Sequence, residues 1–315
     1  MIKRTLYFGN PAYLSLRNAQ LVIKMPEVEK SDKLSDLLKQ ESVRTIPIED
    51  IGVIVLDNKQ ITLTQGLIEA LMDNNCALIG CNARSMPTSL TLPLAGNTLQ
   101  QERFTQQIEA SLPLRKQLWQ QTIHAKITNQ AYLLEKYTAT ETRCMLAWAA
   151  DVRSGDPDNL EGRAAAYYWK NIFYPYVPFF TRGREGEPPN PLLNYGYAIL
   201  RAIIARALIS SGLLPTLGIH HHNRYNAYCL ADDIMEPYRP FVDQLVLSIV
   251  KSNTDYQELN RELKAQLLSI PTLDVSIDGK RSPLMIAATT TTASLAKCFS
   301  GELRKIVYPE FSEKT

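Results

Sequence analysis

The sequence predicts an α+β protein with two domains: a small β-rich N-terminal domain over residues 1–100 and a larger, mainly α-helical domain over residues 101–315. Before about residue 100, short β-branched or aromatic segments alternate with Asn, Pro and Gly, which is typical of strands. After it, apolar residues recur three and four positions apart, which is typical of helices. The length of 315 residues also exceeds the usual size of a single hydrophobic core.

The strand-like segments of the N-terminal region are TLYFG, YLSLR, QLVIK, IGVIVLD and ALIGC. One helix is expected over residues 64–73, because its apolar residues have helical spacing and Thr64 can cap it. The helix lies between the last two strand-like segments. We therefore expect a strand–helix–strand unit within a mostly antiparallel domain.

Three irregular segments divide the helical region: residues 154–159, 174–191 and 218–226. The first ends in Asp158 and Asn159, and either residue can cap the helix that follows. The second is rich in proline, and a long helix is expected after it, ending at a glycine. The third leads into what the pattern indicates is the final helix.

Composition and charge narrow the class of protein. Lys and Arg number 34 against 32 Asp and Glu, so binding to a polyanion has to come from local clusters. Five cysteines at scattered spacings favour neither a disulfide framework nor a zinc knuckle, and they fit a reducing compartment. The N-terminus lacks a secretory pattern, and the apolar stretch 192–208 carries Arg201 and Arg206, which a bilayer penalises. We expect a cytoplasmic protein without membrane spans.

Histidine and acidic residues cluster in one part of the helical region. Three of the four histidines are consecutive, at 220–222, and Asp232, Asp233 and Glu236 follow them. On a helix, Asp233 and Glu236 share a face. The cluster has two interpretations, a cation site or a solvated turn whose acids stabilise a helix N-terminus.

A hard divalent cation takes oxygen ligands and tolerates one imidazole, whereas structural zinc needs four closed His or Cys ligands. One histidine and several carboxylates therefore point to Mg²⁺ or Mn²⁺. Glu161 is a candidate third carboxylate, although it is equally well explained as an acid in the first turn of a helix. Trp119, Trp148 and Trp169 fall within helical patterns and are expected in the core or an interface.

Four motifs in a fixed order carry a family resemblance: Glu161-Gly162, NPLLNYGY at 190–197, GIHH at 218–221 and LADDIMEPYR at 230–239. In this order the sequence resembles the CRISPR-associated endonuclease/integrase of spacer acquisition. The segments LYFGNPAYLSLRNAQLVIK, RTIPIEDIGVIVLDN and TTTTASLAKCFSGE are similar to the variant that accompanies type II systems. The resemblance spans nearly all 315 residues.

The resemblance implies a metal-dependent DNA endonuclease/integrase of CRISPR adaptation, which inserts spacer DNA into the array by attack of a 3′-hydroxyl on a phosphodiester. It implies a homodimer formed through the β-rich domain, and a small dimeric CRISPR-associated protein as partner. Double-stranded DNA, as protospacer and repeat, is the expected substrate, and the type II effector nuclease is a further candidate partner. Two alternatives stay open: a branched-DNA repair nuclease, and a noncatalytic DNA-binding assembly subunit.

The resemblance also places the catalytic and metal-binding roles on Glu161, His221 and Glu236, with Asp233 as an additional acid. His221 is preferred over its two histidine neighbours because of its distance along the chain from Gly218 and Glu236. Whether it ligates the metal or shuttles a proton stays open. Arg239 can instead pair with an acid of the same motif. The candidates for gripping DNA phosphates are Arg163, Arg182, Arg184, Arg201, Arg224 and Arg239.

Overall fold

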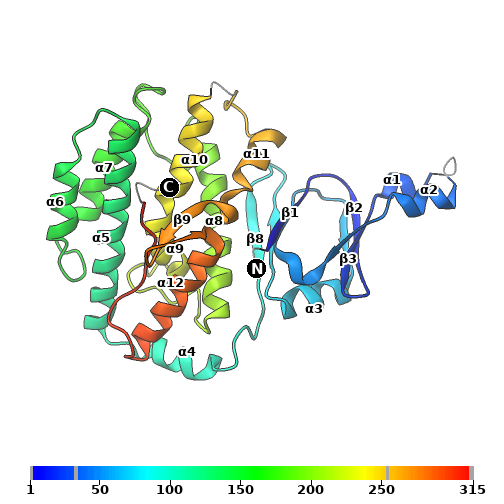
Figure 1. Cartoon of the computed structure of the whole chain (residues 1–315), viewed down its shortest axis with the longest axis horizontal. Helices are drawn as coiled ribbons and strands as arrows, with labels where there is room; N and C mark the ends of the chain where they lie inside the picture. The colour runs from blue at the N-terminus through cyan, green and yellow to red at the C-terminus, as the bar shows by residue number, and fades with distance from the viewer. Residues whose placement is uncertain (1–2, 32–34, 253–254, 312–315) are drawn as a thin grey trace. The chain divides into compact units, whose positions relative to one another are not determined.

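The computed structural model describes residues 3–31, 35–252 and 255–311. The chain divides into two compact units, Met1–Gly96 and Asn97–Thr315. The first contains two β-sheets and the second is mostly helical, as Figure 1 shows. The predicted α+β fold is therefore confirmed.

Two four-stranded sheets form the N-terminal unit. The first has the strand order β1 (Arg4–Phe8), β5 (Ile51–Leu56), β7 (Ala77–Cys81), β8 (Pro87–Thr91). The second has the order β4 (Arg44–Pro47), β3 (Gln20–Lys24), β2 (Ala12–Arg17), β6 (Ile61–Leu63). The short helical segments of this unit are α1 (Pro26–Glu29), α2 (Asp36–Glu41), η1 (Ile48–Asp50) and α3 (Gln65–Asp73).

The predicted strand–helix–strand unit is present, because α3 lies in the connection between β5 and β7, which pair in parallel. The expectation of a mostly antiparallel domain is wrong. β1 also pairs with β5, and β6 with β2, in parallel, whereas the other described pairs are antiparallel. The almost uninterrupted apolar run of β5 is the physical reason, since central parallel strands are buried on both faces.

The C-terminal unit contains the longest helices of the chain. Its elements are α4 (Gln100–Ile108), α5 (Leu112–Tyr137), α6 (Arg143–Asp151), α7 (Leu160–Ile172), α8 (Asn190–Ser210), α9 (Cys229–Met235), η2 (Glu236–Tyr238), α10 (Arg239–Lys251), α11 (Arg261–Leu267), η3 (Ile270–Thr272), β9 (Asp274–Ile277), β10 (Lys280–Pro283) and α12 (Leu284–Phe299). The helix predicted as final is α9, and within the described residues three more helices follow it, so that prediction is wrong.

Helix α8 is the centre of the helical unit. It has a proline in its first turn and ends just before Gly212, whose φ of +74° suits a glycine, as the sequence predicted. It is the one described helix long and apolar enough to cross a membrane, but 78% of its most apolar window is buried inside the protein. Packing against α10 and α12 therefore explains its composition.

Helix α5 positions the parts of the unit that carry the predicted site. It packs against α6, α7, α10 and η2, and Figure 1 shows it running the length of the unit beside α6 and α7. Glu161 lies at the start of α7, and Glu236 begins η2. Helix α5 thus contacts two elements, α7 and η2, that are separated in the sequence by all of α8, by residues 218–226 (the histidine loop) and by α9.

Candidate functional site

The first turn of α7 presents Glu161. Asn159 is the N-cap, with a φ of +51°, and its side-chain oxygen accepts a hydrogen bond of 3.2 Å from the backbone N–H of Gly162. Asp156 accepts a second bond of 2.9 Å from the N–H of Glu161 itself. Of the two predicted caps, Asn159 is therefore the correct one, whereas Asp158 forms an ion pair elsewhere. These bonds fix the helix start, and the Glu161 carboxylate faces α5.

Lys126 of α5 joins the two predicted glutamates. Its Nζ lies 2.5 Å from Oε1 of Glu161 and 2.6 Å from Oε2 of Glu236. Burial disfavours the ammonium, but the carboxylates of Glu236 and Glu161 outweigh burial and raise the pKa of Lys126. Lys126 was not among the predicted site residues, because a lone lysine on a helix is normally a solvated side chain.

Glu236 is the deeper of the two glutamates, with a side chain 6% exposed against 32% for Glu161. Its Oε1 accepts an ion-pair contact of 2.9 Å from Arg239. Burial alone would raise the pKa of Glu236, but the charges of Arg239 and Lys126 lower it. Its Oε2 lies 2.6 Å from the Lys126 ammonium but outside hydrogen-bond geometry, and no other donor among the described residues reaches this buried oxygen.

A buried cluster of hydrogen-bonded side chains packs against Arg239. Its guanidinium lies 4.8 Å from the ring centre of Tyr197, whose hydroxyl donates to Asp243 at 2.5 Å. Tyr168 donates to the other oxygen of Asp243 at 2.9 Å. These groups come from α7, α8 and α10, so the cluster ties three helices together beneath Glu236. Burial raises the pKa of Asp243 to about 6.

Asp233 organises the histidine loop. Its fully buried carboxylate accepts backbone N–H bonds from Ile219 at 2.7 Å, His220 at 2.9 Å and His221 at 3.2 Å. It also accepts a short side-chain bond from Nδ1 of His221. This bond raises the pKa of His221, and burial opposes it. Because Nδ1 is held, Nε2 is the ring nitrogen that His221 presents to other groups.

Trp119 of α5 packs against the same loop. Its ring is stacked parallel to His220, with centroids 4.0 Å apart, and meets His221 edge-on at 5.7 Å. Trp119 is buried, in agreement with the prediction that it belongs to the core. Its contact with the histidines was not predictable from its position in a helical pattern. Helix α5 therefore provides both Lys126 and the aromatic ring against which His220 and His221 pack.

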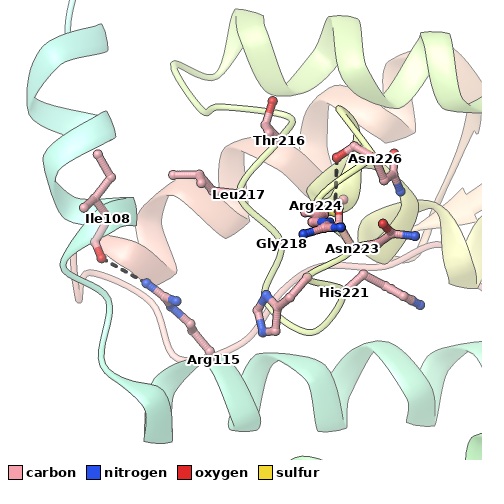
Figure 2. A pocket seen from close by; sticks show the side chains of 11 residues that line it. Ile108, Arg115, Thr216, Leu217, Gly218, His221, Asn223, Arg224 and Asn226 are labelled. Carbon is pink, nitrogen blue, oxygen red and sulfur yellow. Dashed lines mark hydrogen bonds between the residues drawn. The ribbon is translucent and has the colours of Figure 1, made fainter.

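His221 also lines a pocket of about 370 Å³, shown in Figure 2. Arg115 and Arg224 contribute positive charge to it, and Figure 2 shows the side chain of Arg115 bonded to the backbone of Ile108 at one side of the pocket. The rest of the lining is a mixture of polar and apolar groups from α4 and the segment between α8 and α9, namely Ile108, Thr216, Leu217, Gly218, His222, Asn223, Asn226 and Cys229. The pocket opens beside the predicted histidine and could accept an anionic group.

The structure therefore brings the predicted site residues into one region, but their side chains do not all converge on one position. Glu161 and Glu236 meet at Lys126, and His221 is near enough to Glu236 for its charge to contribute to the raised pKa. As the described side chains stand, no three His, Cys, Asp or Glu groups form a metal cage. The donor set nevertheless fits a hard divalent cation, because two carboxylates already hold a positive charge and one buried oxygen lacks a hydrogen bond.

The six predicted DNA-binding arginines fall into two groups. Three are held within the chain: Arg182 bonds Asn190 and Asn194, Arg201 pairs with Asp232 at 2.6 Å, and Arg239 pairs with Glu236. The other three have exposed side chains and lie on the first turns of α7, in the proline-rich loop and in the histidine loop: Arg163, Arg184 and Arg224. The second group is better placed to reach a phosphate backbone.

A β-rich unit followed by a helical unit of this kind is a fold that solved structures share. A casposase bound to integration product superimposes with a TM-score of 0.77 and 23% identity, covering 97% of this chain and 92% of the casposase. A chain of a Cas6-RT-Cas1–Cas2 complex superimposes with a TM-score of 0.74 and 18% identity, covering 99% of this chain and 36% of that one. The fold thus places the protein among Cas1-like and casposase structures.

Comparison of the sequence with known proteins identifies the family within this fold class. The family described as CRISPR associated protein Cas1 matches residues 6–269. The CRISPR-associated endonuclease Cas1 of Neisseria meningitidis serogroup C (strain 8013) is 33% identical over 296 residues, which cover 93% of this chain and 91% of that protein. The chain belongs to the CRISPR-associated protein Cas1 family, and the resemblance in its motifs is confirmed.

Proposed function

We propose that the protein is the metal-dependent DNA endonuclease/integrase of CRISPR adaptation, which joins a DNA 3′-hydroxyl to a phosphodiester of the array. The observation that carries the proposal is the convergence of Glu161 and Glu236 on one buried cationic position, beside the His221–Asp233 pair. Two relatives support it: one is named an endonuclease, and the casposase is bound to an integration product.

Glu161 and Glu236 would hold Mg²⁺ or Mn²⁺. Such a cation stabilises negative charge on a phosphorane-like transition state and lowers the pKa of an attacking hydroxyl. Asp233 fixes His221 through Nδ1, so Nε2 faces the reaction as a ligand when neutral and as a proton donor when charged. In this assignment Asp233 orients the histidine and does not ligate the cation.

Arg163, Arg184 and Arg224 would contact the phosphates of double-stranded protospacer and repeat DNA, because their side chains are exposed. For assembly we propose a homodimer and the small dimeric CRISPR-associated partner, supported by the similar chain in a complex with Cas2. The type II effector nuclease and a cytoplasmic location complete the proposal, and both rest on the family resemblance.

The test is a strand-joining assay with Mn²⁺, a protospacer-like duplex and a plasmid that contains the repeat. Replacing Glu161 by Gln, or His221 by Ala, should reduce joining by about 10²-fold or more, since Glu161 would hold the cation and His221 would bind it or donate a proton. Glu102→Gln is the matched control, because Glu102 is also an acid in the first turn of a helix and is exposed on α4.

Full activity in Glu161→Gln would contradict the proposal and leave Glu161 as a helix-end acid. Cutting of branched DNA without joining would indicate the repair nuclease instead. Intact DNA binding without calorimetric binding of Mn²⁺ would indicate the noncatalytic assembly subunit.

A further inference from the structure

Lys126 occupies the position between the two carboxylates that the proposed function gives to the divalent cation. We propose that Lys126 is a displaceable counter-cation: its ammonium holds Glu161 and Glu236 together in the metal-free protein and leaves the gap when the divalent cation binds. The inference rests on the proposed function for the identity of that cation, but it assigns a role to a residue outside the predicted site.

The contacts of Lys126 are strongly electrostatic, but they do not hold the side chains in one fixed geometry. Among the described residues its polar partners are Glu161 and Glu236, at 2.5 and 2.6 Å. The contact with Glu161 is a hydrogen bond, whereas Oε2 of Glu236 receives no aligned donor. A lysine ammonium is a compact point charge on a flexible four-carbon stem, and it lacks the planar, bidentate geometry of a guanidinium. Lys126 therefore neutralises the acids without locking their geometry.

Arg239 is the fixed cation of the site. It pairs with Oε1 of Glu236, and its guanidinium packs on the ring of Tyr197. Two carboxylates are thus balanced by two cations in the metal-free protein. A divalent cation added to this set would leave buried positive charge without a partner, which is strongly unfavourable. Departure of the less constrained cation, Lys126, relieves that imbalance.

Glu161 lies on the solvent-exposed side of the site. The side chain of Lys126 is 8% exposed and that of Glu236 is 6% exposed, whereas Glu161 is 32% exposed. Solvent therefore reaches the site past Glu161. We infer that the cation enters on this side and that the Lys126 ammonium swings outward along it.

The first test is Mn²⁺ binding, measured by calorimetry on the full chain. Lys126→Met keeps the length of the side chain and removes the competing charge, so Mn²⁺ should bind about tenfold tighter or more. Lys116→Met, an exposed lysine of the same helix, is the matched control and should bind as the wild type does. Equal or weaker binding in Lys126→Met would overturn the proposal.

Thermal unfolding of the same proteins separates this role from a purely structural one. Without metal, Lys126→Met should unfold at a lower temperature than the wild type, because Glu236 is left buried with less compensation. Mn²⁺ should then raise its unfolding temperature by more than it raises that of the wild type. A loss of stability that Mn²⁺ fails to restore indicates a structural lysine and overturns the proposal.

A second measurement uses the wild-type protein and is independent of how the variant folds. Lys126 should be protected from an amine-reactive reagent without metal and become labelled when Mn²⁺ is added, whereas labelling of Lys116 should be unaffected. Unchanged protection of Lys126 at saturating Mn²⁺ would overturn the proposal. The Glu161→Gln variant distinguishes a wrong role for Lys126 from a wrong proposed function. If Mn²⁺ binds the wild type and does not bind Glu161→Gln, the cation site stands and only the role of Lys126 is refuted.

Discussion

Three acids in the segment Asp232–Glu236 have three different sets of partners. Asp232 pairs with Arg201 and accepts a bond of 2.7 Å from Asn226. Asp233 holds the backbone and side chain of the histidine loop, and Glu236 faces Lys126. Like charges so close together would repel, and the structure separates them by giving each carboxylate its own donors. Neighbouring acids in one motif therefore have distinct roles. Of these three acids, only Glu236 faces the position between Glu161 and Glu236 that the Lys126 ammonium occupies.

The His221–Asp233 pair predicts a pH dependence of stability in the metal-free protein. The pKa of His221 is raised above its ordinary value of about 6.5. A raised pKa stabilises the fold when the imidazole is charged, so this contribution is complete below about pH 6.5 and is lost as pH rises through the folded-state pKa. Urea unfolding in the presence of a chelator should show the difference in free energy of unfolding between wild type and His221→Ala shrinking as pH rises above about 6.5.

A double-mutant cycle provides the control. In an Asp233→Asn background, the change in stability caused by His221→Ala should depend less on pH, because the main charged partner of the imidazole is gone and only the weaker contributions of Glu236 and Asp232 remain. The imidazole is partly exposed, so solvent screening keeps the effect modest. A difference between wild type and His221→Ala that grows with pH would contradict the assigned partner.

At the residue scale, the sequence was informative where chemistry is concentrated in motifs. Motif order pointed to Glu161, His221 and Glu236 as one set, and in the structure the two glutamates of this set contact the same lysine. Lys126 and Trp119 were not predictable, because each lies alone in the helical pattern of α5 and acquires its partners only through packing. The role of Asp233 was also hidden, since its backbone donors come from a loop 12 to 14 residues away.

At the scale of elements, the loop between α8 and α9 depends on one glycine. A Cβ atom built on Gly218 would overlap the carbonyl oxygen of His221 and lie 2.8 Å from Oδ2 of Asp233. Oδ2 of Asp233 is held in place, because it accepts hydrogen bonds from the backbone N–H groups of Ile219 and His220. The close approach of Gly218 is therefore what allows Asp233 to gather three backbone N–H groups of the loop.

Gly218→Ala should displace this loop. We expect a loss of stability of about 1–3 kcal/mol, typical of overpacking a fixed site, together with reduced strand joining. Urea unfolding and the joining assay measure the two effects. Gly183→Ala is the control, because a Cβ there meets its nearest neighbour at an ordinary distance of 3.7 Å. Wild-type joining by Gly218→Ala would show that the loop tolerates the displacement or plays no part in the reaction.

Element types were largely predictable, and their pairing was not. The strand-like segments became β1, β2, β3, β5 and β7, because alternation and β-branching are local signals. Parallel pairing of β5 and β7 depends on which segments meet in space, and a local pattern carries no such information. The β9–β10 hairpin was missed for a related reason: its four-residue strands are too short to show a period within a helical region.

At the scale of the whole molecule, charge is nearly balanced, with a formal net charge of +2. A long-range field therefore contributes little to DNA binding, and local phosphate contacts have to supply the affinity. The division of the arginines matters here, because an arginine that already pairs with a carboxylate of the same chain has little charge to offer. Arg163, Arg184 and Arg224 are the candidates that keep exposed side chains in the helical unit.

The salt dependence of DNA affinity measures how many arginines contact phosphates. Each arginine that contacts a phosphate adds about 0.9 to the slope of log affinity against log salt concentration. Replacing Arg163, Arg184 and Arg224 by Ala together should lower the magnitude of this slope by about two to three, and each single variant should lower it by about one. Fluorescence anisotropy with a duplex between about 50 and 200 mM salt measures it. Arg153→Ala is the control, since Arg153 is exposed but already paired with Asp158 at 2.6 Å, and its slope should match the wild type. An unchanged slope in the triple variant would place the phosphate contacts on other residues, whereas an equal drop in Arg153→Ala would show that any exposed arginine of this unit contributes through its charge alone.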